Sequence, residues 1–423
     1  MKNMHSNACK AMKCIYIYEV GDETMIDYTK YRMNQLNSTC AEFIRQESAG
    51  SLLLMLATII AMVLANSPMA ETYEHALHLF VDLPLLPDMS LLHWVNDGLM
   101  AIFFLVVGME IKREFLFGEL KSLSATLLPI AAAVGGMLIP AALYSLFNMG
   151  GPIAQGWAIP MSTDIAFSLG VLAFTAKRVP RSVIVFLTAL AIVDDLGGIV
   201  VIALFYSTQL HWTALGAGLA VLMLMALFSW RNVHHPLPYV LGGVLTWYAF
   251  YQAGIHPTVA GVLTGFLIPA GTENTQHSHP LHLWEHKLSP WSAFLIMPIF
   301  ALGNAGISMT SESFASLASP IGLGIIAGLF LGKPLGIFTT VFLMVKLGIA
   351  KKPEGAKWMH YLGASILAGI GFTMSIFLAS LSFSDPAELT SAKAAIVTAS
   401  ILSGLVGSFV FKISEDRKQG NRT

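Results

Sequence analysis

Long runs of apolar residues dominate the chain from about residue 49 onward. No Asp, Glu, Lys or Arg occurs between Glu47 and Glu71, and 42 uncharged residues separate Lys121 from Asp164. A helix that crosses a bilayer needs about 20 apolar residues, so the second run holds one crossing and the start of another. The twelve crossings that this pattern predicts are residues 49–66, 93–111, 123–147, 152–175, 181–206, 213–230, 236–250, 254–269, 287–306, 321–345, 359–382 and 392–412.

The distribution of basic residues predicts the orientation of these crossings. With twelve crossings both termini lie on one side, and every Lys and Arg except Lys333 and Lys393 falls on that side. Loops on the cytoplasmic side of a membrane carry the excess of Lys and Arg. We therefore expect a cytoplasmic N-terminal tail over residues 1–48, a membrane domain over 49–412 and a cytoplasmic C-terminal tail over 413–423.

Composition agrees with a membrane protein. Hydrophobic residues make up 55% of the chain and charged residues 12%, whereas soluble domains are about 25% charged. The net charge of −1 shows no basic excess, so the expected partner is the lipid bilayer and not a nucleic acid. The three cysteines all lie within the first 40 residues, so no disulfide framework runs through the membrane domain. That segment also lacks the apolar core of a signal peptide.

The longest polar stretch on the opposite side is residues 67–92. It carries several acidic residues and a strand-like run, Leu77–Leu86, that contains a proline. This pattern predicts a small external hairpin.

Five ionisable residues interrupt stretches that are otherwise apolar: Asp97, Asp164, Asp194, Asp195 and Lys333. An ionisable side chain near the bilayer centre costs about 2.5–3.5 kcal/mol on insertion scales, so it usually marks an ion path or a charged partner. The alternative for any one of them is a hydrogen-bonded structural group. Several carboxylates and a lysine in one membrane domain favour a functional site.

The adjacent carboxylates of Asp194 and Asp195 are informative because neighbours on a helix point about 100° apart. Two close carboxylates repel each other when both are ionised, which raises one pKa toward the working pH. A buried lysine is able to neutralise one of them and leave the other free. The free carboxylate, together with Asp164 from another crossing, makes a hard-oxygen site suited to a small cation or to protons.

Helix-breaking residues interrupt crossings four and eleven. Pro160 precedes Asp164 by four residues, and crossing eleven contains Gly369-Ile370-Gly371-Phe372-Thr373. These crossings are the middle members of two triplets, and interruptions at matching positions of inverted repeats indicate a transporter's midplane site. Asp164 is placed to compensate the positive half-helix ends there, and Lys333 the negative ones.

At these residues the chain resembles the NhaA-type sodium/proton antiporter family, from about Phe43 to Phe411. The motifs that carry the resemblance occur in order and are residues 95–101 (VNDGLMA), 108–114 (GMEIKRE), 163–167 (TDIAF), 194–195 (DD), 254–256 (GIH), 332–336 (GKPLG) and 369–375 (GIGFTMS).

The resemblance implies an all-α membrane protein of twelve transmembrane helices, with two inverted-topology repeats and with helices four and eleven broken. It implies exchange of Na⁺ or Li⁺ for H⁺ at Asp194 and Asp195, with Asp164 and Thr163 beside them. The family's lysine at Lys333 pairs with the carboxylate at Asp194, and the carboxylate at Asp195 is the principal cation ligand.

The resemblance also implies a transporter of the bacterial inner membrane that is not an enzyme and needs no cofactor. It further implies a homodimer that forms through the external hairpin, residues 67–92.

Histidine and clustered charges are candidates for sensing pH, because histidine titrates nearest the physiological range. The candidates are Asp97, Glu110, Arg113, Glu114, His256, Glu285 and His286. Glu285 and His286 match the region that the family links to its pH response. The alternative is that the charged groups anchor helix ends at the membrane interface. For the loop with His277, His279, His282 and His286, a polar cytoplasmic loop is favoured over a metal site, since no cysteine completes the set.

An intramembrane aspartyl protease is the alternative function, since it also needs two membrane carboxylates. Its usual Gly-x-Gly-Asp stretch is absent before Asp194, where the sequence reads Ala191-Ile192-Val193. An ion channel ranks third because a channel does not need broken helices. The sequence therefore predicts an electrogenic antiporter that exchanges cytoplasmic Na⁺ for external H⁺ and controls internal pH and sodium.

Overall fold

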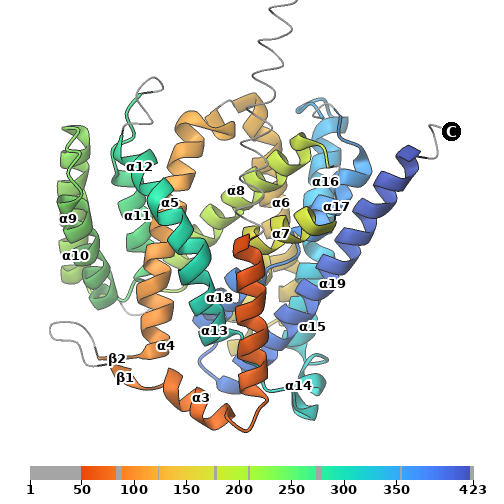
Figure 1. Ribbon diagram of the computed structural model, residues 1–423, viewed down its shortest axis with the longest axis horizontal. Coiled ribbons are helices and arrows are strands. Elements are labelled where there is room, and N and C mark those ends of the chain that lie inside the picture. The colour runs from red at the N-terminus through yellow and green to blue at the C-terminus, as the bar shows by residue number, and fades with distance from the viewer. Residues whose placement is uncertain are drawn as a thin grey trace, which may run out of the picture. The chain divides into compact units, whose positions relative to one another are not determined.

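The computed structural model describes residues 49–81, 88–121, 123–175, 179–207, 210–272, 279–352 and 355–419. Within these ranges the chain is almost entirely helical, and the described strands form a single two-stranded sheet (Figure 1). The predicted tail over residues 1–48, His277, the hairpin tip at 82–87 and the last four residues lie outside the described part.

Six helices of this part are each long and apolar enough to cross a membrane. Two of them combine several elements: Leu91–Phe117 joins α4 (Leu91–His93), η1 (Trp94–Leu99) and α5 (Met100–Phe117), and Pro320–Lys346 joins α15 (Pro320–Ile326), η6 (Ala327–Gly332) and α16 (Lys333–Lys346). The other four are α6 (Leu123–Phe147) over Thr126–Phe147, α8 (Arg181–Phe205), α9 (Trp212–Trp230) and α19 (Pro386–Gln419) over Pro386–Ser414.

Three bent pairs of helices pass the same test together, which gives up to nine spans among the described residues. They are Ala49–Ala65 with α3 (Ala70–Leu77), η3 (Pro152–Met161) with α7 (Ile165–Thr175), and α17 (Trp358–Leu367) with α18 (Phe372–Ser382). Crossings seven to nine were predicted where the chain forms α10 (Leu237–Ala253), α11 (Thr258–Leu267) and the run α12 (Pro280–Trp291), η5 (Ser292–Ile296) and α13 (Met297–Asn304). These helices are not among the stretches that are long and apolar enough to cross a membrane.

The predicted interruptions of crossings four and eleven are confirmed. The η3–α7 pair bends by 44° around residues 162–164, and the α17–α18 pair bends by 43° around residues 368–371. Proline has no N–H to donate and crowds the preceding turn, so Pro160 ends the helical hydrogen bonding of its crossing. Both crossings thus leave backbone groups in the membrane interior that need partners from elsewhere.

The predicted hairpin is present, and its first strand lies inside the predicted strand-like run, but a helix precedes it. The strands β1 (Phe80–Val81) and β2 (Met89–Ser90) pair antiparallel, with Phe80 opposite Ser90. Residues 70–77, just before the hairpin, form the helix α3, which the sequence did not predict and which turns by 116° from the preceding helix. Glu71 in the first turn of α3 and His75 in the last suit the helix dipole, so the local sequence held a signal for this helix.

Glycines let two helix pairs approach closely. A Cβ added to Gly261 of α11 would lie 2.1 Å from the Ala101 carbonyl oxygen of α5, and one added to Gly336 of α16 would lie 2.1 Å from the Gly135 oxygen of α6. Small residues commonly allow such backbone contact between membrane helices. The second contact fixes the start of α16, where Lys333 lies.

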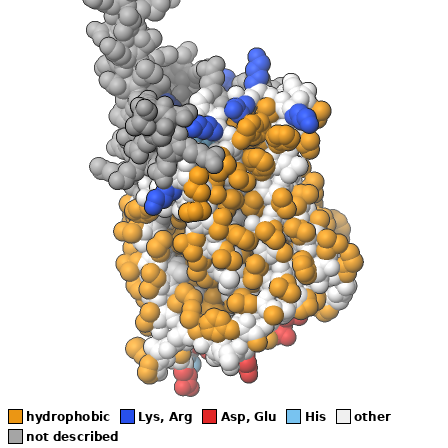
Figure 2. Space-filling model, turned by 90° about the vertical axis from the view of Figure 1, so that its right-hand side faces the viewer, with side chains coloured by type: hydrophobic (Ala, Val, Ile, Leu, Met, Phe, Trp, Pro, Cys, Tyr) orange, Lys and Arg blue, Asp and Glu red, His pale blue; other side chains and the backbone are white. Residues whose placement is uncertain are grey.

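Charges separate toward two ends of the helical body. Figure 2 shows Lys and Arg side chains at one end, Asp and Glu side chains at the other, and a wide apolar belt between them. We call the end where α5 finishes with Lys112 and Arg113 the basic end. The other, acidic end holds α3 and α14 (Ser311–Ser316), which carry Glu71 and Glu312 (Figure 1).

Candidate functional site

The two broken crossings satisfy each other's backbone at their breaks. Asp164 N–H donates to the Ile370 carbonyl at 2.7 Å. The Thr163 hydroxyl donates to the Ala368 carbonyl at 2.9 Å, and the Ser168 hydroxyl donates to the Leu367 carbonyl at 2.9 Å. Unpaired backbone groups are costly in a membrane, so these contacts are what permits both interruptions.

Asp164 lies where two helices begin. Its Oδ1 accepts from Phe167 N–H of α7 at 3.0 Å, and its Oδ2 accepts from Thr373 N–H of α18 at 3.1 Å. The Thr373 hydroxyl also donates to Oδ2. A carboxylate at a helix N-terminus is stabilised by the free N–H groups and the dipole. Asp164 therefore compensates two positive helix ends, as its position in the sequence predicted.

Thr373→Val should weaken this junction, because valine keeps the shape of threonine and removes the hydroxyl. Losing a hydrogen bond to a charged group costs about 1.5–3 kcal/mol, so we expect a lower melting temperature in detergent and slower exchange. The matched control is Thr246→Val, since the equally buried Thr246 hydroxyl bonds only to Gly242 of its own helix. Equal effects in both variants would contradict the assigned contact.

Lys333 pairs with Asp194. Lys333 Nζ lies 2.5 Å from Asp194 Oδ2, and both side chains are fully buried. The same ammonium donates to the Met161 carbonyl, which ends η3. The lysine thus neutralises a carboxylate of α8 and the negative end of a half-helix. The pairing that the family resemblance implied is present.

Asp195 is the carboxylate left over. It is buried, and its Oδ1 accepts no hydrogen bond from any described residue. The carboxylates of Asp194 and Asp164 are close enough to repel a negative charge on Asp195. A buried carboxylate without a partner is costly, so Asp195 has capacity for a proton or a cation.

Asp97 and His256 lie 159 positions apart in sequence and meet in the fold. His256 Nε2 is 3.4 Å from Asp97 Oδ1, and His256 Nδ1 is 2.7 Å from the Thr258 hydroxyl oxygen. The His256 ring packs edge-on against Phe377 of α18. The sequence singled out both residues separately, and the fold links them to one of the broken crossings.

Arg113 joins three of the predicted pH-sensing candidates at the basic end. Its guanidinium contacts Glu285 Oε1 and Glu114 Oε1, each at 2.8 Å, and Glu110 lies within range of its charge. His286 is exposed, and its ring lies 6.5 Å from that of His282. The fold therefore brings Glu110, Arg113, Glu114 and Glu285 together and leaves His286 on the surface.

Of the described histidines in the histidine-rich segment, His279 precedes α12 and is partly buried, as is His282, whereas His286 is exposed. The His279 ring packs 4.7 Å from that of His234 in a T-shaped arrangement. Among the residues that the structure describes, no group of three or more His, Cys, Asp and Glu side chains is arranged to hold a metal ion.

Comparison with known proteins agrees with this geometry. The family model described as Na⁺/H⁺ antiporter 1 matches residues 41–411. The chain belongs to this family. It is accordingly a membrane transporter and not an enzyme.

Two relatives illustrate the closeness. The chain is 51% identical over 376 residues to the "Na(+)/H(+) antiporter NhaA 2" of Clostridium beijerinckii, covering 88% of this chain and 93% of the relative. It is 47% identical over 386 residues to the NhaA antiporter of Vibrio campbellii, covering 90% and 97%.

One solved structure, the sodium proton antiporter MjNhaP1 from Methanocaldococcus jannaschii at pH 8, is similar with a TM-score of 0.52. The identity is 15%, covering 88% of this chain and 96% of that one. This similarity concerns the fold alone.

In this Na⁺/H⁺ antiporter 1 family member, Glu285 titrates in an unusual range. It lies just before predicted crossing nine, and burial raises its pKa to about 7 although Arg113 opposes the shift. Between pH 4.5 and 7 the folded chain therefore holds a proton that the unfolded chain has lost, so stability should fall as pH rises through that window. Glu285→Gln should remove this fall, as measured by melting temperature against pH. The exposed Glu312→Gln is the control, and an unchanged profile in Glu285→Gln would refute the assignment.

Hydroxyl residues at the breaks are the functional positions that sequence reasoning missed. Thr373 stood in a quoted motif without a role, and Ser168 was not singled out. Ser400 of α19 accepts from Phe372 N–H at 3.3 Å and so caps α18. The available signal was a hydroxyl in an apolar crossing near a predicted break, where it serves as a partner for freed backbone groups.

Proposed function

We propose that this chain exchanges cytoplasmic Na⁺, or Li⁺, for external H⁺ and that the exchange is electrogenic. The observation that carries the proposal is the asymmetric carboxylate pair: Lys333 binds Oδ2 of Asp194 and does not pair with Asp195, while Oδ1 of each aspartate has no partner among the described residues. The family and the names of the relatives support Na⁺/H⁺ antiport. Li⁺ is added because it is also a small hard cation.

Competition for one site drives the exchange. A protonated Asp195 binds no sodium, and sodium displaces the proton when it binds. Asp164 and Thr163 supply further oxygens, since both flank the break beside α8 and Thr163 lies close to Asp194. Each occupied form then reorients across the membrane, so that sodium leaves and protons enter.

The exchange is electrogenic because the Lys333–Asp194 pair also releases a proton during the cycle. The lysine ammonium is held by one carboxylate and one carbonyl. When sodium engages Asp194, the lysine loses its counter-ion and releases its proton. More protons than sodium ions then move in each cycle, and the membrane potential helps to drive transport. The exchange would in this way control internal pH and sodium.

The complete architecture that we propose has twelve transmembrane helices in two inverted repeats. The three helical segments that fall short of the spanning test occupy the positions of crossings seven to nine. The protein lies in a bacterial inner membrane, and its basic end and both chain termini face the cytoplasm. This orientation agrees with the excess of basic residues at that end. Residues 67–92 form a homodimer contact, which the exposed Phe80 on the short strand β1 supports.

The proposed pH response resides in the clusters around Arg113 and around Asp97. Both contain carboxylates against a cationic or titratable partner, Glu285 in the first and His256 in the second. Protonation removes the negative charge of Glu285 at the contact between α5 and α12, and that of Asp97 at the contact between η1 and the turn before α11.

The aspartyl protease alternative is not favoured. A protease dyad needs two carboxylates that share a proton across a substrate. Here Asp194 is bound to a lysine, and Asp195 is its neighbour on the same helix.

The decisive experiment measures half-maximal sodium concentration against pH in proteoliposomes. If sodium displaces protons from the same carboxylates, apparent affinity should weaken about tenfold per pH unit for each proton displaced as pH falls. Substitution of Asp164 or Asp194 should change the slope, and Asp195→Asn should leave no sodium response, whereas Glu285→Gln should shift the curve along the pH axis with its slope intact. If the apparent sodium affinity does not change between about pH 6 and 9, sodium and protons do not compete for one site and must use separate paths.

A further inference from the structure

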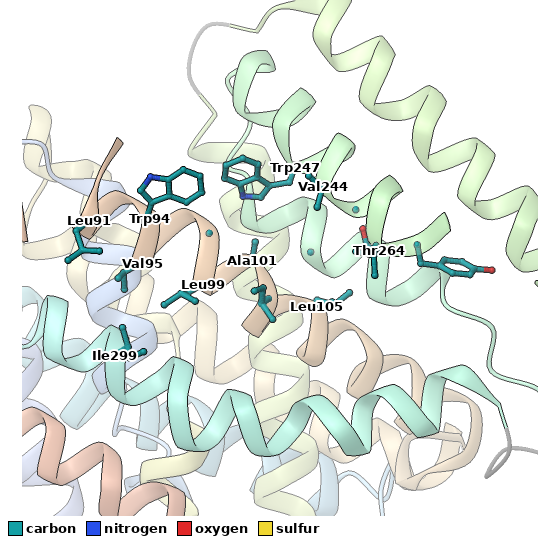
Figure 3. A pocket seen from close by; sticks show the side chains of 16 residues that line it. Leu91, Trp94, Val95, Leu99, Ala101, Leu105, Val244, Trp247, Thr264 and Ile299 are labelled. Atoms are coloured by element: carbon teal, nitrogen blue, oxygen red, sulfur yellow. The ribbon is translucent and has the colours of Figure 1, made fainter. Parts of the chain in front are cut away.

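An apolar cavity of about 740 Å³ lies between the first half of Leu91–Phe117 and the helices α10 and α11. Figure 3 shows Trp94 and Trp247 side by side at one end and Thr264 toward the other. Buried residues Ala101 and Thr264 line its depth, and the exposed Ile102, Val240 and Val244 lie at its rim. Because this rim belongs to the apolar belt, the cavity opens where the chain contacts lipid.

The cavity is elongated along the helices. Its lining extends from Leu91 to Leu105, which is about 21 Å at 1.5 Å per residue. Half of a bilayer's hydrocarbon core is about 15 Å deep. A groove of this length, parallel to the crossing helices and almost wholly apolar, matches a hydrocarbon chain that stands upright in one leaflet better than a compact polar ligand.

Two polar atoms in the lining have no partner among the described residues: Trp94 Nε1 and Thr264 Oγ1. The neighbouring Trp247 is satisfied, since its Nε1 donates to the Asp97 carbonyl at 2.9 Å. Trp94 lies close to β2 at the acidic end, where tryptophan typically meets lipid headgroups and ester groups. Trp94 Nε1 is itself covered by protein, so an ester carbonyl at that level becomes its acceptor when the ring turns toward the lipid.

We infer that this cavity binds one acyl chain of a phospholipid from the leaflet at the acidic end, with the ester carbonyl at Trp94 and the chain directed toward Thr264. The bound chain supports the stacked indoles of Trp94 and Trp247, whose rings lie 5.9 Å apart. Through Trp247 it also supports the π-helical turn η1, which presents Asp97 to His256. The site is separate from Asp164, Asp194, Asp195 and Lys333.

The test uses the purified chain in phosphatidylcholine vesicles that contain a fraction of phosphatidylcholine with a photoreactive diazirine on one acyl chain. After irradiation, labelled residues are mapped by mass spectrometry. A diazirine near the carboxyl end should label residues around Trp94, and one near the methyl end should label residues around Leu105 and Thr264. The reverse order would overturn the assigned leaflet.

Two matched variants separate a bound chain from ordinary contact with bulk lipid. Val244→Trp places an indole at the rim, whereas Leu245→Trp places one on the same helix outside the cavity; Val244 is 53% exposed and Leu245 is 57% exposed. Labelling of residues 94–105 should be lost in the first variant and kept in the second. The proposal would be overturned if labelling depended only on how exposed each residue is, or if both variants lost labelling equally. It would also be overturned if a second copy of the chain covered the cavity.

Removal of the indole donor gives an independent measurement. Trp94→Phe keeps an aromatic ring in the stack and removes Nε1. Native mass spectrometry should find less phospholipid retained per chain than in Trp212→Phe, which alters an exposed tryptophan on α9. Equal retention would show that the ester carbonyl does not bind Trp94.

Discussion

Asp195→Asn should abolish sodium-driven proton movement while the protein still folds and inserts. The amide cannot exchange a proton at any relevant pH, and it offers a sodium ion one neutral oxygen in place of a charged one. Asp195 binds no lysine in the structure and leaves Oδ1 without a partner. Its replacement therefore breaks no buried ion pair, and the melting temperature should stay at or above that of the unaltered chain.

The measurement is the sodium-dependent collapse of a preformed proton gradient in proteoliposomes, with protein content matched. Asp385→Asn is the control, because this exposed aspartate accepts a hydrogen bond from Ala387 N–H at the start of α19 and lies outside the carboxylate site. Full exchange by a well-folded Asp195→Asn protein would remove Asp195 from the transport site.

Lys333→Ala should lower the free energy of unfolding by about 3–5 kcal/mol, since removal of one partner leaves a buried, uncompensated charge on the other. Two groups lose their partner here, the carboxylate of Asp194 and the Met161 carbonyl at the end of η3. Exchange should weaken as well, because the half-helix end would shift.

Lys346→Ala is the matched control, since Lys346 ends the same helix α16 and is exposed. Melting temperatures in detergent should separate the two variants clearly. The double variant Lys333→Ala with Asp194→Asn should recover part of the loss, because it removes both buried charges. Equal melting of the two single variants, or no recovery in the double variant, would mean that the pair does not stabilise the fold.

Several features of this antiporter family member were predictable from local sequence. Apolar runs gave the positions of the crossings, because a bilayer demands about 20 apolar residues regardless of tertiary contacts. Pro160 and the Gly369–Gly371 segment gave both breaks, because proline and glycine disturb helical geometry wherever they occur. The five ionisable residues inside apolar stretches also stood out locally, since each is costly against an apolar background.

The partners of those charges depended on the tertiary structure. Lys333 is 139 positions from Asp194 and 138 from Asp195 in sequence, and nothing local to either aspartate distinguishes them. The close approach of α6 and α16 at Gly135 and Gly336 fixes where the lysine begins its helix, and the ammonium then meets Asp194. The resemblance supplied that pairing in advance, but the residues alone left the choice open.

Asp164 shows the same division between sequence and structure. Its burial and its place beside a break were readable from the sequence, yet its hydroxyl partner Thr373 comes from the other broken crossing, 209 positions away. The pair of Asp97 and His256 was likewise decided in three dimensions. Hydropathy and breakers report how each segment meets the membrane, whereas partners depend on the relative register of distant helices. The sequence by itself therefore determined where the chain is apolar enough to cross, where two crossings break and where charges lie, and only the packing of the helices decided that Lys333 pairs with Asp194 and not with Asp195.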